Sequence, residues 1–535
     1  MNATAAATAR TRPSRRPFEG LITDQNYMWW ASIPIMLGMF LVVMDATIVN
    51  VALPHILAAF GGSVEDLEWV STGYMLSAAV MMPTTGFLGD RFGRKRLYSI
   101  ATVLFTVLSG FCGLAWNLGS LVLFRVLQGV VGGAIQPLGQ SLLYEAFPRE
   151  RRGVAMAIIG FGAMMAPALG PTLGGYLVDN LSWRSIFYIN LPVGILASFL
   201  SLAILRESPM RKASFDFWGF LLMATFLPTL LLAISQGNSK GWHSFFIIGL
   251  FAVSAVAFGA FLIVVLWRQE PIVDLSIFAN VTYAAGTISG VVLGIGLFGA
   301  TFLLPLFLQN IQGLTAFQTG LLMLPQGAVM GLVMPISGAL IQRIEARIQL
   351  GIGMALLSGS MFLQAHLNVA TPPALIILWT IIGGTGRALA FPAMNVTSLS
   401  AVPIRKIGQA TGLYNVTRQV GGAFGVAIVG TVLIQRQIFH QCILGQAMAI
   451  TDNVHGFLAH ASQLLITGGA SPYTAHLQAA MALGQLAAKQ ASVWAFQDSF
   501  RVAGMVSILG IIPAFFMKPR NSDPQEDQLE ALAVE

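Results

Sequence analysis

Long apolar stretches recur along almost the whole chain, and polar residues gather in the short segments between them. A transmembrane helix needs about 20 mainly apolar residues, and by that criterion the pattern predicts about fourteen spans. Their approximate limits are 30–58, 69–89, 97–116, 119–144, 153–178, 184–205, 216–235, 244–266, 281–309, 316–340, 350–368, 374–400, 408–435 and 493–517. The pattern therefore predicts an all-α protein that crosses a membrane many times.

The composition agrees with this pattern. Of the 535 residues 56% are hydrophobic and only 10% are charged, whereas soluble domains carry about 25% charged residues. The net charge of +7 does not indicate nucleic-acid binding, because no basic domain is present. Two cysteines are too few for a disulfide framework. We find no phosphate-binding loop of the G-x-x-x-x-G-K-[ST] type, no metal cluster and no nucleophile–base pair, so we expect neither a cofactor nor an enzyme.

The basic residues fall mainly in alternate loops. If the N-terminus lies inside, the cytoplasmic loops contain Arg91, Arg94, Lys95, Arg96, Arg149, Arg151, Arg152, Arg206, Arg211, Lys212, Arg268, Arg343, Arg347, Arg405 and Lys406. Positively charged loops stay on the cytoplasmic side. We therefore expect both termini in the cytoplasm, as tails at residues 1–28 and 518–535.

A short motif occurs twice. MMPTTGFLGDRFGRK (81–95) has a fainter copy, VMPISGALIQRIEAR (333–347), in which Gln342 replaces Asp90. Parallel repeats are typical of transporters built from two six-helix halves, although a chance match over so short a window stays open. The predicted division is an N-terminal half at 29–205, two inserted helices with flanking loops at 206–278, and a C-terminal half at 279–517 that includes a long external loop at 436–492. Within this loop, residues 474–490 are rich in alanine, leucine and glutamine and have a helical pattern. The loop either docks a partner or is a tolerated insertion.

One acid lies within the first apolar run. Residues 41–56 read LVVMDATIVNVALPHI, with Asp45 near the middle. An acid at membrane depth costs about 2.5–3.5 kcal/mol on insertion scales and is functional by default. Because burial favours the protonated form of a carboxyl group, Asp45 is a candidate to bind and release a proton. The alternative is an acid that only fixes helix packing.

Arg125 interrupts the fourth span in the run LVLFRVLQGVVGGA. It needs a carboxylate or backbone carbonyls as a partner, and Asp45 is the obvious candidate. A guanidinium favours the charged acid while burial opposes it. A change in that balance between inward and outward states would couple proton binding to movement. A static buried ion pair is the alternative.

The segment GFLGDRFGRKRL (86–97) combines glycines with charges. Glycines let two helices approach closely, and a charge network can hold one conformation and release it on rearrangement. The predicted conformational switch consists of Gly86, Gly89, Asp90, Arg91, Gly93, Arg94 and Lys95. The alternative is a plain cytoplasmic loop with positive charge.

A second glycine-rich segment, GAMMAPALGPTLGGYL (162–177), lies in the fifth span. Its glycines mark a close-packing face, and its prolines are expected to kink the helix. The residues concerned are Gly162, Pro167, Gly170, Pro171, Gly174 and Gly175. The alternative is helix packing without a meaning for the direction of transport.

Four further charges fall inside predicted spans, where we expect them to be buried. Arg387 either extends toward the cytoplasm or contacts a substrate, and Arg418 opens the thirteenth span. Asp498 and Arg501 are three residues apart in the last span, a spacing at which they can pair with each other.

Taken together, these motifs resemble the major facilitator superfamily. The runs MDATIVNVALPHI, WRSIFYINLPVG, EPIVDLSIF and RQVGGAFGVAI narrow the resemblance to its fourteen-helix drug:proton antiporter family, the EmrB/QacA type. The resemblance ties the arginine of the fourth-span motif to proton transfer, and the fifth-span motif to export. It also implies an inner-membrane location, small hydrophobic substrates, and a periplasmic adaptor (EmrA type) with an outer-membrane channel.

The expected function is therefore proton-coupled export of hydrophobic drugs by alternating access, with substrates, protons and membrane lipids as the partners. An exporter of one dedicated metabolite and a same-fold importer or uniporter remain the alternatives. A membrane enzyme or sensor would need a catalytic constellation or an output domain, for which the tails are too short.

Overall fold

The computed structural model describes residues 22–61, 64–208, 210, 216–268, 271–341, 343–450 and 452–517. Most of the two predicted tails (residues 1–21 and 518–535) and Gln342 of the faded repeat lie outside the described residues. The long helices are α1 (Tyr27–Phe60), α2 (Val64–Phe92), α3 (Arg94–Gly113), α4 (Leu118–Ala146), α5 (Arg152–Asn180), α7 (Asn190–Ile204), α8 (Phe217–Lys240), α9 (Phe245–Trp267), α10 (Val281–Asn310), α11 (Ala316–Leu340), α12 (Ala346–Gln364), α13 (Pro373–Ser400), α14 (Ile407–Ile450), α15 (Asp452–Thr467) and α16 (Pro472–Leu509). Short helices are α6 (Ser185–Tyr188), α17 (Ile511–Ala514), η1 (Arg149–Arg151), η2 (Leu275–Ala279) and η3 (Ile404–Lys406).

The all-α prediction is confirmed. Within the described residues, 13 helical segments are long and apolar enough to cross a membrane. Helix α2 has the length of a span but falls outside this set; its first two turns include Glu65, Asp66 and Glu68, and Thr84 and Thr85 lie nearer its end. With α2 included, the structure is consistent with the fourteen predicted spans.

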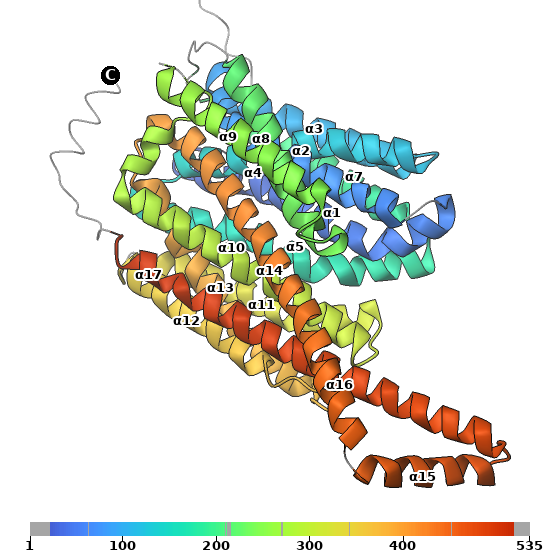
Figure 1. The fold of residues 1–535 in the computed structure, drawn as a ribbon. Coiled ribbons are helices and arrows are strands. Elements are labelled where there is room, and N and C mark those ends of the chain that lie inside the picture. Colours follow the sequence, from blue (N-terminus) through green and yellow to red (C-terminus); the bar gives the residue numbers. More distant parts are fainter. Residues whose placement is uncertain are drawn as a thin grey trace, which may run out of the picture.

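The helices form two bundles that pack side by side (Figure 1). One bundle contains α1 to α7, in which α2 and α3 pack on α4, and α1 packs on α5. The other contains α10 to α17, in which α12 packs on α13, and α14 packs on α10 and α16. The bundles meet along two seams, one between α5 and α11 and the other between α2 and α14.

The two inserted helices cover the seam between α2 and α14. Helix α8 packs on both of these helices, and α9 packs on α8. The side chain of Asn238 on α8 donates a hydrogen bond to the carbonyl of Ala427 on α14 (3.2 Å) and accepts one from Thr431 (2.6 Å). The insertion is therefore attached to both halves.

Glycines allow the closest approaches at the two seams. A side-chain carbon on Gly86 of α2 would lie 2.5 Å from the backbone nitrogen of Gln409 on α14. A side-chain carbon on Gly338 of α11 would lie 2.5 Å from the carbonyl oxygen of Gly153 on α5. Gly86 and Gly338 are matched positions of the predicted repeat, so the two copies form the same kind of helix crossing.

Hydrogen bonds also join the halves near the first crossing. The hydroxyls of Ser141 on α4 and Thr411 on α14 are 2.8 Å apart. The amide of Asn415 on α14 donates to the side-chain oxygen of Gln140 on α4 (2.7 Å). All four side chains are buried. Each of them has a hydrogen-bond partner, so this polar contact between the halves does not destabilise the interior.

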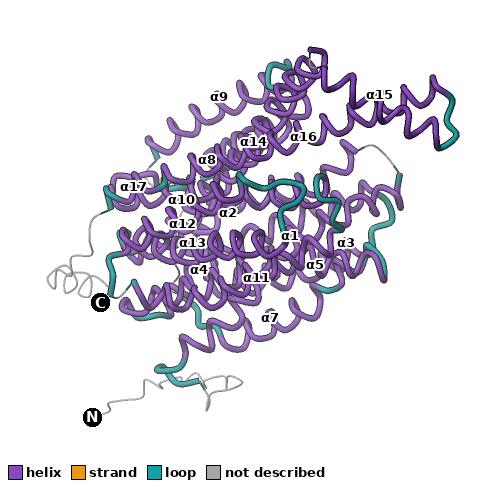
Figure 2. Tube along the Cα trace, turned by 90° about the horizontal axis from the view of Figure 1, so that it is seen from below, coloured by secondary structure: helices purple, strands orange, loops and turns teal. Residues whose placement is uncertain are grey.

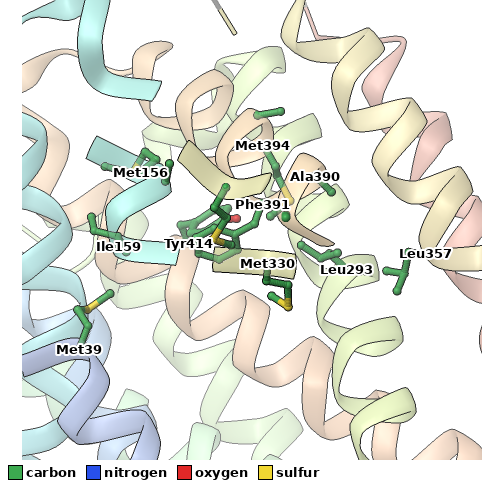
Figure 3. Packing of buried hydrophobic residues seen from close by; sticks show 14 of the residues in the cluster. Met39, Met156, Ile159, Leu293, Met330, Leu357, Ala390, Phe391, Met394 and Tyr414 are labelled. Atoms are coloured by element: carbon green, nitrogen blue, oxygen red, sulfur yellow. The ribbon is translucent and has the colours of Figure 1, made fainter. Parts of the chain in front are cut away.

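Apolar side chains from both halves form one continuous core. Figure 3 shows Met39, Met156 and Ile159 of the first half opposite Phe391, Tyr414 and other residues of the second. Methionine and aromatic side chains dominate this part of the core, and methionine adapts its shape to changing neighbours.

Residues 436–492 are helical over most of their length, whereas the sequence predicted a helix only over 474–490. Helix α14 continues without a break to Ile450, α15 follows, and α16 runs from Pro472 directly into the last span. The segment has no proline before Pro472, and alanine, leucine and glutamine favour helix. Figures 1 and 2 show α15 and the adjoining ends of α14 and α16 projecting beyond the bundle.

The Gly86 crossing gives a first prediction. We expect cysteines placed at Ser141 and Thr411, without the two native cysteines, to form a disulfide readily, since their side chains touch. Adding Gly86→Val should lower the cross-linking yield several-fold, because an overpacked contact costs about 1–3 kcal/mol.

Gly351→Val is the matched control, because a side-chain carbon on Gly351 meets no atom within 4 Å. The yield is measured by gel mobility after mild oxidation of isolated membranes. An equal yield in the Gly86 and Gly351 variants would contradict the proposed closeness of the α2–α14 crossing.

Candidate functional site

Asp45 lies inside the first half, away from lipid. It is in the middle of α1, and its side chain is 0% exposed. The neighbouring apolar residues of α1 place it at membrane depth, where an acid needs polar partners. The structure supplies these partners from other helices of the same half.

The carboxylate accepts three hydrogen bonds. Its Oδ2 lies 2.5 Å from Nη1 of Arg125 on α4. Its Oδ1 accepts from the amide of Asn190, the first residue of α7, at 2.7 Å and from the amide of Gln128 on α4 at 3.2 Å. Ser109 on α3 accepts from the same Asn190 amide, so the network joins α1, α3, α4 and α7.

The pairing of Asp45 with Arg125 is confirmed, and Arg125 is fixed by further contacts. Its Nε donates to the carbonyl of Val70 on α2 (3.1 Å), and Nη1 donates to Gln128 (2.8 Å). Its guanidinium lies 4.1 Å from the ring centre of Tyr74 on α2. Because the side chain is 1% exposed, these contacts replace the water that the guanidinium has lost.

Two opposing effects determine how much the Asp45–Arg125 pair contributes to stability. Removing both charges from water is costly, and only good geometry with satisfied hydrogen bonds compensates. A proton on Asp45 would remove the charge attraction, and Arg125 would then be a buried cation without a counter-charge. Proton binding therefore favours any arrangement of the helices that gives Arg125 another partner or water.

The predicted conformational switch forms a second charge network. Arg94 pairs with Asp90 on the preceding turn (2.7 Å) and with Glu145 at the end of α4. Glu145 also accepts from the hydroxyl of Ser208 (2.6 Å). Gly89 is buried beside Arg94, whereas Arg91 is exposed and Lys95 is partly exposed.

Gly93 makes the turn that separates α2 from α3. Its φ of +94° is a conformation that suits glycine, and a side-chain carbon there would lie 2.6 Å from the carboxyl carbon of Glu207. That carboxylate accepts from the backbone nitrogens of Lys95 (2.9 Å) and Arg96 (3.2 Å). A carboxylate at a helix N-terminus is favourable.

This network lies against the other half of the molecule. A side-chain carbon on Gly408 of α14 would be 3.2 Å from Nη2 of Arg94, and Gly86 meets the next residue of α14. Arg94 is therefore held by two acids of its own half, directly beside the seam that must open if α2 and α14 separate.

The fifth-span motif packs α5 onto the helix that carries Asp45. A side-chain carbon on Gly162 would lie 3.0 Å from the carbonyl of Met36, and one on Gly174 would lie 2.8 Å from Ile48. Gly170 packs against Thr47, two residues after Asp45, while Gly175 faces α11. Pro167 and Pro171 lie in the same helix. Because α5 also forms a seam, it connects Asp45 with the second half.

Asp498 and Arg501 pair as predicted, at 2.7 Å. Asp498 also contacts Arg436 (2.6 Å) and His440 (2.9 Å) of α14. The interpretation of Arg501 as buried is wrong, because 48% of its side chain is exposed. These contacts tie α14 to α16 at the base of the projecting helices.

Arg387 is buried, as predicted, and 5% of its surface is exposed. Arg418 is partly buried, and its centre is 5.9 Å from the ring centre of Phe391. Among the described residues, neither arginine has an acidic partner within 4.0 Å, and Nε of each lacks a hydrogen-bond acceptor. No group of three or more possible metal ligands occurs in the described part of the chain.

Sequence reasoning missed several partners. Gln128 and Asn190 are neutral amides, which leave little mark on a hydropathy pattern, although Gln128 is three residues from Arg125 and therefore on the same helix face. Glu145 and Glu207 were not predicted as partners of these residues. Both are far in sequence from Arg94 and Gly93, which they contact.

Comparison with known proteins gives consistent matches. The model of the Major Facilitator Superfamily matches residues 35–426. The multidrug export protein EmrB of Haemophilus influenzae is 33% identical over 416 residues, which cover 76% of this chain and 81% of that protein. The multidrug resistance protein Stp of Mycobacterium tuberculosis is 35% identical over 399 residues, or 74% of each chain.

A solved structure, that of the human organic anion transporter MFSD10 (TETRAN), aligns with a TM-score of 0.59 and 13% identity, covering 92% of this chain and 99% of that one. At this identity the likeness concerns the fold alone. The sequence matches confirm the resemblance drawn from the motifs.

The ion pair gives a second prediction. Arg125→Met should lower the free energy of unfolding by about 3–5 kcal/mol, because it leaves a buried carboxylate without its cation. The double variant Asp45→Leu/Arg125→Met should recover at least half of that loss, since no charge is then left unpaired. Thermal unfolding of the detergent-purified protein at pH 8 measures both. Losses that simply add in the double variant would contradict a direct pairing.

Proposed function

The chain belongs to the Major Facilitator Superfamily, and from this premise we propose that it exports hydrophobic drugs or other toxic compounds across the bacterial inner membrane in exchange for protons. The matches to EmrB and Stp, whose names describe multidrug export and resistance, support the direction and the class of substrate. Alternating access of a site between the two halves is the proposed mechanism.

The observation that carries the proposal is the fully buried carboxylate of Asp45, held by Arg125, Asn190 and Gln128. In the proposed cycle, a proton from outside neutralises Asp45 and weakens its hold on Arg125. The helices that carry these partners then rearrange. Release of the proton to the cytoplasm restores the pair between Asp45 and Arg125. Binding and release of the proton are thereby coupled to the rearrangement of the helices.

The charge network around Arg94 supplies the second part of the cycle. With the pairs to Asp90 and Glu145 intact, α2 lies close against α14, and this end of the bundle is closed. Opening that end would separate Gly86 from α14 and require the network to rearrange. The fifth-span glycines link the two events, since α5 contacts both α1 and the second half.

We propose that both termini face the cytoplasm, which places the projecting helices around α15 on the outer side. The loop charges support this orientation. In a double-membrane bacterium, the projecting helices are then available to a periplasmic adaptor of an export path that continues to an outer-membrane channel. The EmrB matches are consistent with such a tripartite system.

Asp45→Asn should abolish drug resistance in a hypersensitive host that expresses the chain, while its abundance in the membrane stays normal. The amide keeps the size of the side chain and cannot exchange a proton at ordinary pH. Asp24→Asn is the matched control, because the Asp24 side chain is 88% exposed and surface ion pairs contribute little. Resistance is measured as the inhibitory concentration of several drugs, with and without an ionophore.

Full resistance of the Asp45→Asn strain would remove this residue from proton coupling. Export that persists after the ionophore collapses the proton gradient would reject the antiporter and favour a uniporter of the same fold.

Asp90→Asn should reduce the export rate several-fold, because Arg94 then keeps only one of its two carboxylates. Gln342→Ala, at the matching position of the second repeat, should have little effect, since a glutamine carries no charge to lose. Efflux of a fluorescent dye from preloaded cells measures both rates. Similar rates in the two variants would show that the charge network is not confined to the first half.

A further inference from the structure

The carboxylate of Asp45 is surrounded by hydrogen-bond donors. Arg125 donates to its Oδ2, and the side-chain amides of Gln128 and Asn190 donate to its Oδ1. A charged carboxylate is an acceptor only, so three donors suit it well. A protonated carboxyl group instead carries one O–H, which needs an acceptor. The arrangement is therefore that of the charged acid, and proton binding requires a change in one of the three partners.

No other group at this position can take the place of such an acceptor. Asp45 is 0% exposed, so bulk water does not reach it, and a buried donor without an acceptor is strongly unfavourable. The titratable side chains that interact with it are Arg125, Tyr74 of α2 and Cys112 of α3. In the described part of the chain, neither Tyr74 nor Cys112 forms a hydrogen bond with the carboxylate. The acceptor must therefore come from the present partners.

Two of the three partners are fixed as donors. The guanidinium of Arg125 has donors and no acceptor. The amide oxygen of Gln128 accepts from Nη1 of Arg125 (2.8 Å) and lies 3.6 Å from Sγ of Cys112. If this amide turned over, its NH2 group would face the guanidinium, donor against donor. Arg125 and Gln128 therefore keep their orientation whether or not the acid carries a proton.

The amide of Asn190 has the freedom that the other two partners lack. Its nitrogen donates to Asp45 (2.7 Å) and to the hydroxyl oxygen of Ser109 (3.0 Å). Its oxygen is buried and has no hydrogen-bond partner among the described residues. A half-turn about the last side-chain bond exchanges oxygen and nitrogen, which are almost equal in size. This half-turn breaks no hydrogen bond of the amide oxygen.

Ser109 accommodates both orientations of the amide. Its hydroxyl accepts from Asn190 and donates to the carbonyl of Phe187 (3.0 Å). A hydroxyl group has one donor and two acceptor positions, and it rotates to suit its neighbours. After the half-turn it can donate to the Asn190 oxygen, beside the O–H of Asp45. One end of the amide then lacks a partner in either orientation, so the protonation state of Asp45 decides which orientation is preferred.

An amide oxygen without a partner is not by itself evidence for such a role. Asn395 of α13 is also 0% exposed, and its oxygen also has no partner in the described residues. Its nitrogen donates to the backbone carbonyl of Phe391 (2.8 Å), which is an acceptor at every pH. Asn190 differs because its nitrogen faces a group that changes from an acceptor to a donor when it binds a proton.

We propose that Asn190 is a positioning residue for the proton on Asp45: its amide donates to the carboxylate and, after a half-turn, accepts the O–H of the protonated acid. The inference rests on the proposed function, in which Asp45 takes up a proton during export. The proton binds to Oδ1, while Oδ2 stays available to Arg125 as a weaker, neutral acceptor, and no covalent bond breaks. Asn190 thereby allows both forms of a buried acid.

Isotope-edited infrared spectroscopy tests the half-turn directly. The full chain, with ¹³C in the side-chain carbonyl of its asparagines, is reconstituted in liposomes, and difference spectra are recorded as the pH falls from about 9 to about 4. We expect the carbonyl band of protonated Asp45 to appear. Over the same pH range the carbonyl band of Asn190 should move to lower wavenumber, because accepting hydrogen bonds weakens the carbonyl bond.

Two variants assign these bands. Both changes should be lost in Asp45→Asn, and the Asn190 band should be lost in Asn190→Leu, which keeps nearly the same shape without polar atoms. Asp45→Asn alone assigns the shift if Asn190→Leu does not accumulate in the membrane. Asn395→Leu is the matched control, because it removes a buried asparagine that faces no acid, and its spectra should retain the pH-dependent shift.

The outcomes separate this inference from the proposed function. An Asp45 band that appears without any shift of the Asn190 band would overturn the half-turn and leave proton binding by Asp45 intact. A shift that persists in Asp45→Asn would also overturn it, since the amide would then respond to another group. Absence of an Asp45 band at every pH would overturn proton binding by this acid, and the role of Asn190 with it.

Discussion

The arrangement of the first half depends on the need to neutralise one carboxylate in the membrane interior. Asp45 cannot be hydrated where it lies, so α3, α4 and α7 each present a polar group toward it, and α2 supports the arginine that pairs with it. A pair of this kind adds little net stability, because its desolvation offsets its attraction. Its main effect is to tie together the helices that supply its hydrogen-bonding partners, so that a change at the carboxylate is felt by all of them.

The two halves pack through equivalent glycine contacts, but their charged residues are distributed differently. The glycines of the repeated motif form equivalent crossings, Gly86 against α14 and Gly338 against α5. Around the first crossing, Asp90, Arg94 and Glu145 form a charge network. At the second crossing, neutral groups take over, with Gln349 of α12 donating to the hydroxyl of Ser337 on α11 (2.6 Å). Close packing therefore closes both seams, and an acid–arginine network lies beside the first of them.

The sequence was informative where one physical effect dominates. The cost of burying polar backbone sets the spans, and the cost of burying charge singled out Asp45 and its pairing with Arg125. The sequence was less informative where several weak effects compete. Residues 436–492 lack a membrane-length apolar run, so hydropathy predicted an external loop, and the helical pattern was visible only over residues 474–490. Asn190 and Glu145 were missed as partners because neutral amides carry little signal and contacts distant in sequence leave none. The exposed position of Arg501 depends on helix rotation, which packing determines.

Export against a gradient requires that proton and substrate prefer different conformations of the same chain. A link between them must therefore run through elements that touch both halves. Helix α5 meets this requirement, since its glycines pack on α1 beside Asp45 and its Gly160 reaches Phe391 of α13. Helix α14 of the second half also meets this requirement, because α14 lies beside the Arg94 network of the first half and carries Arg418. A shift of either helix therefore changes the surroundings of charged residues in both halves.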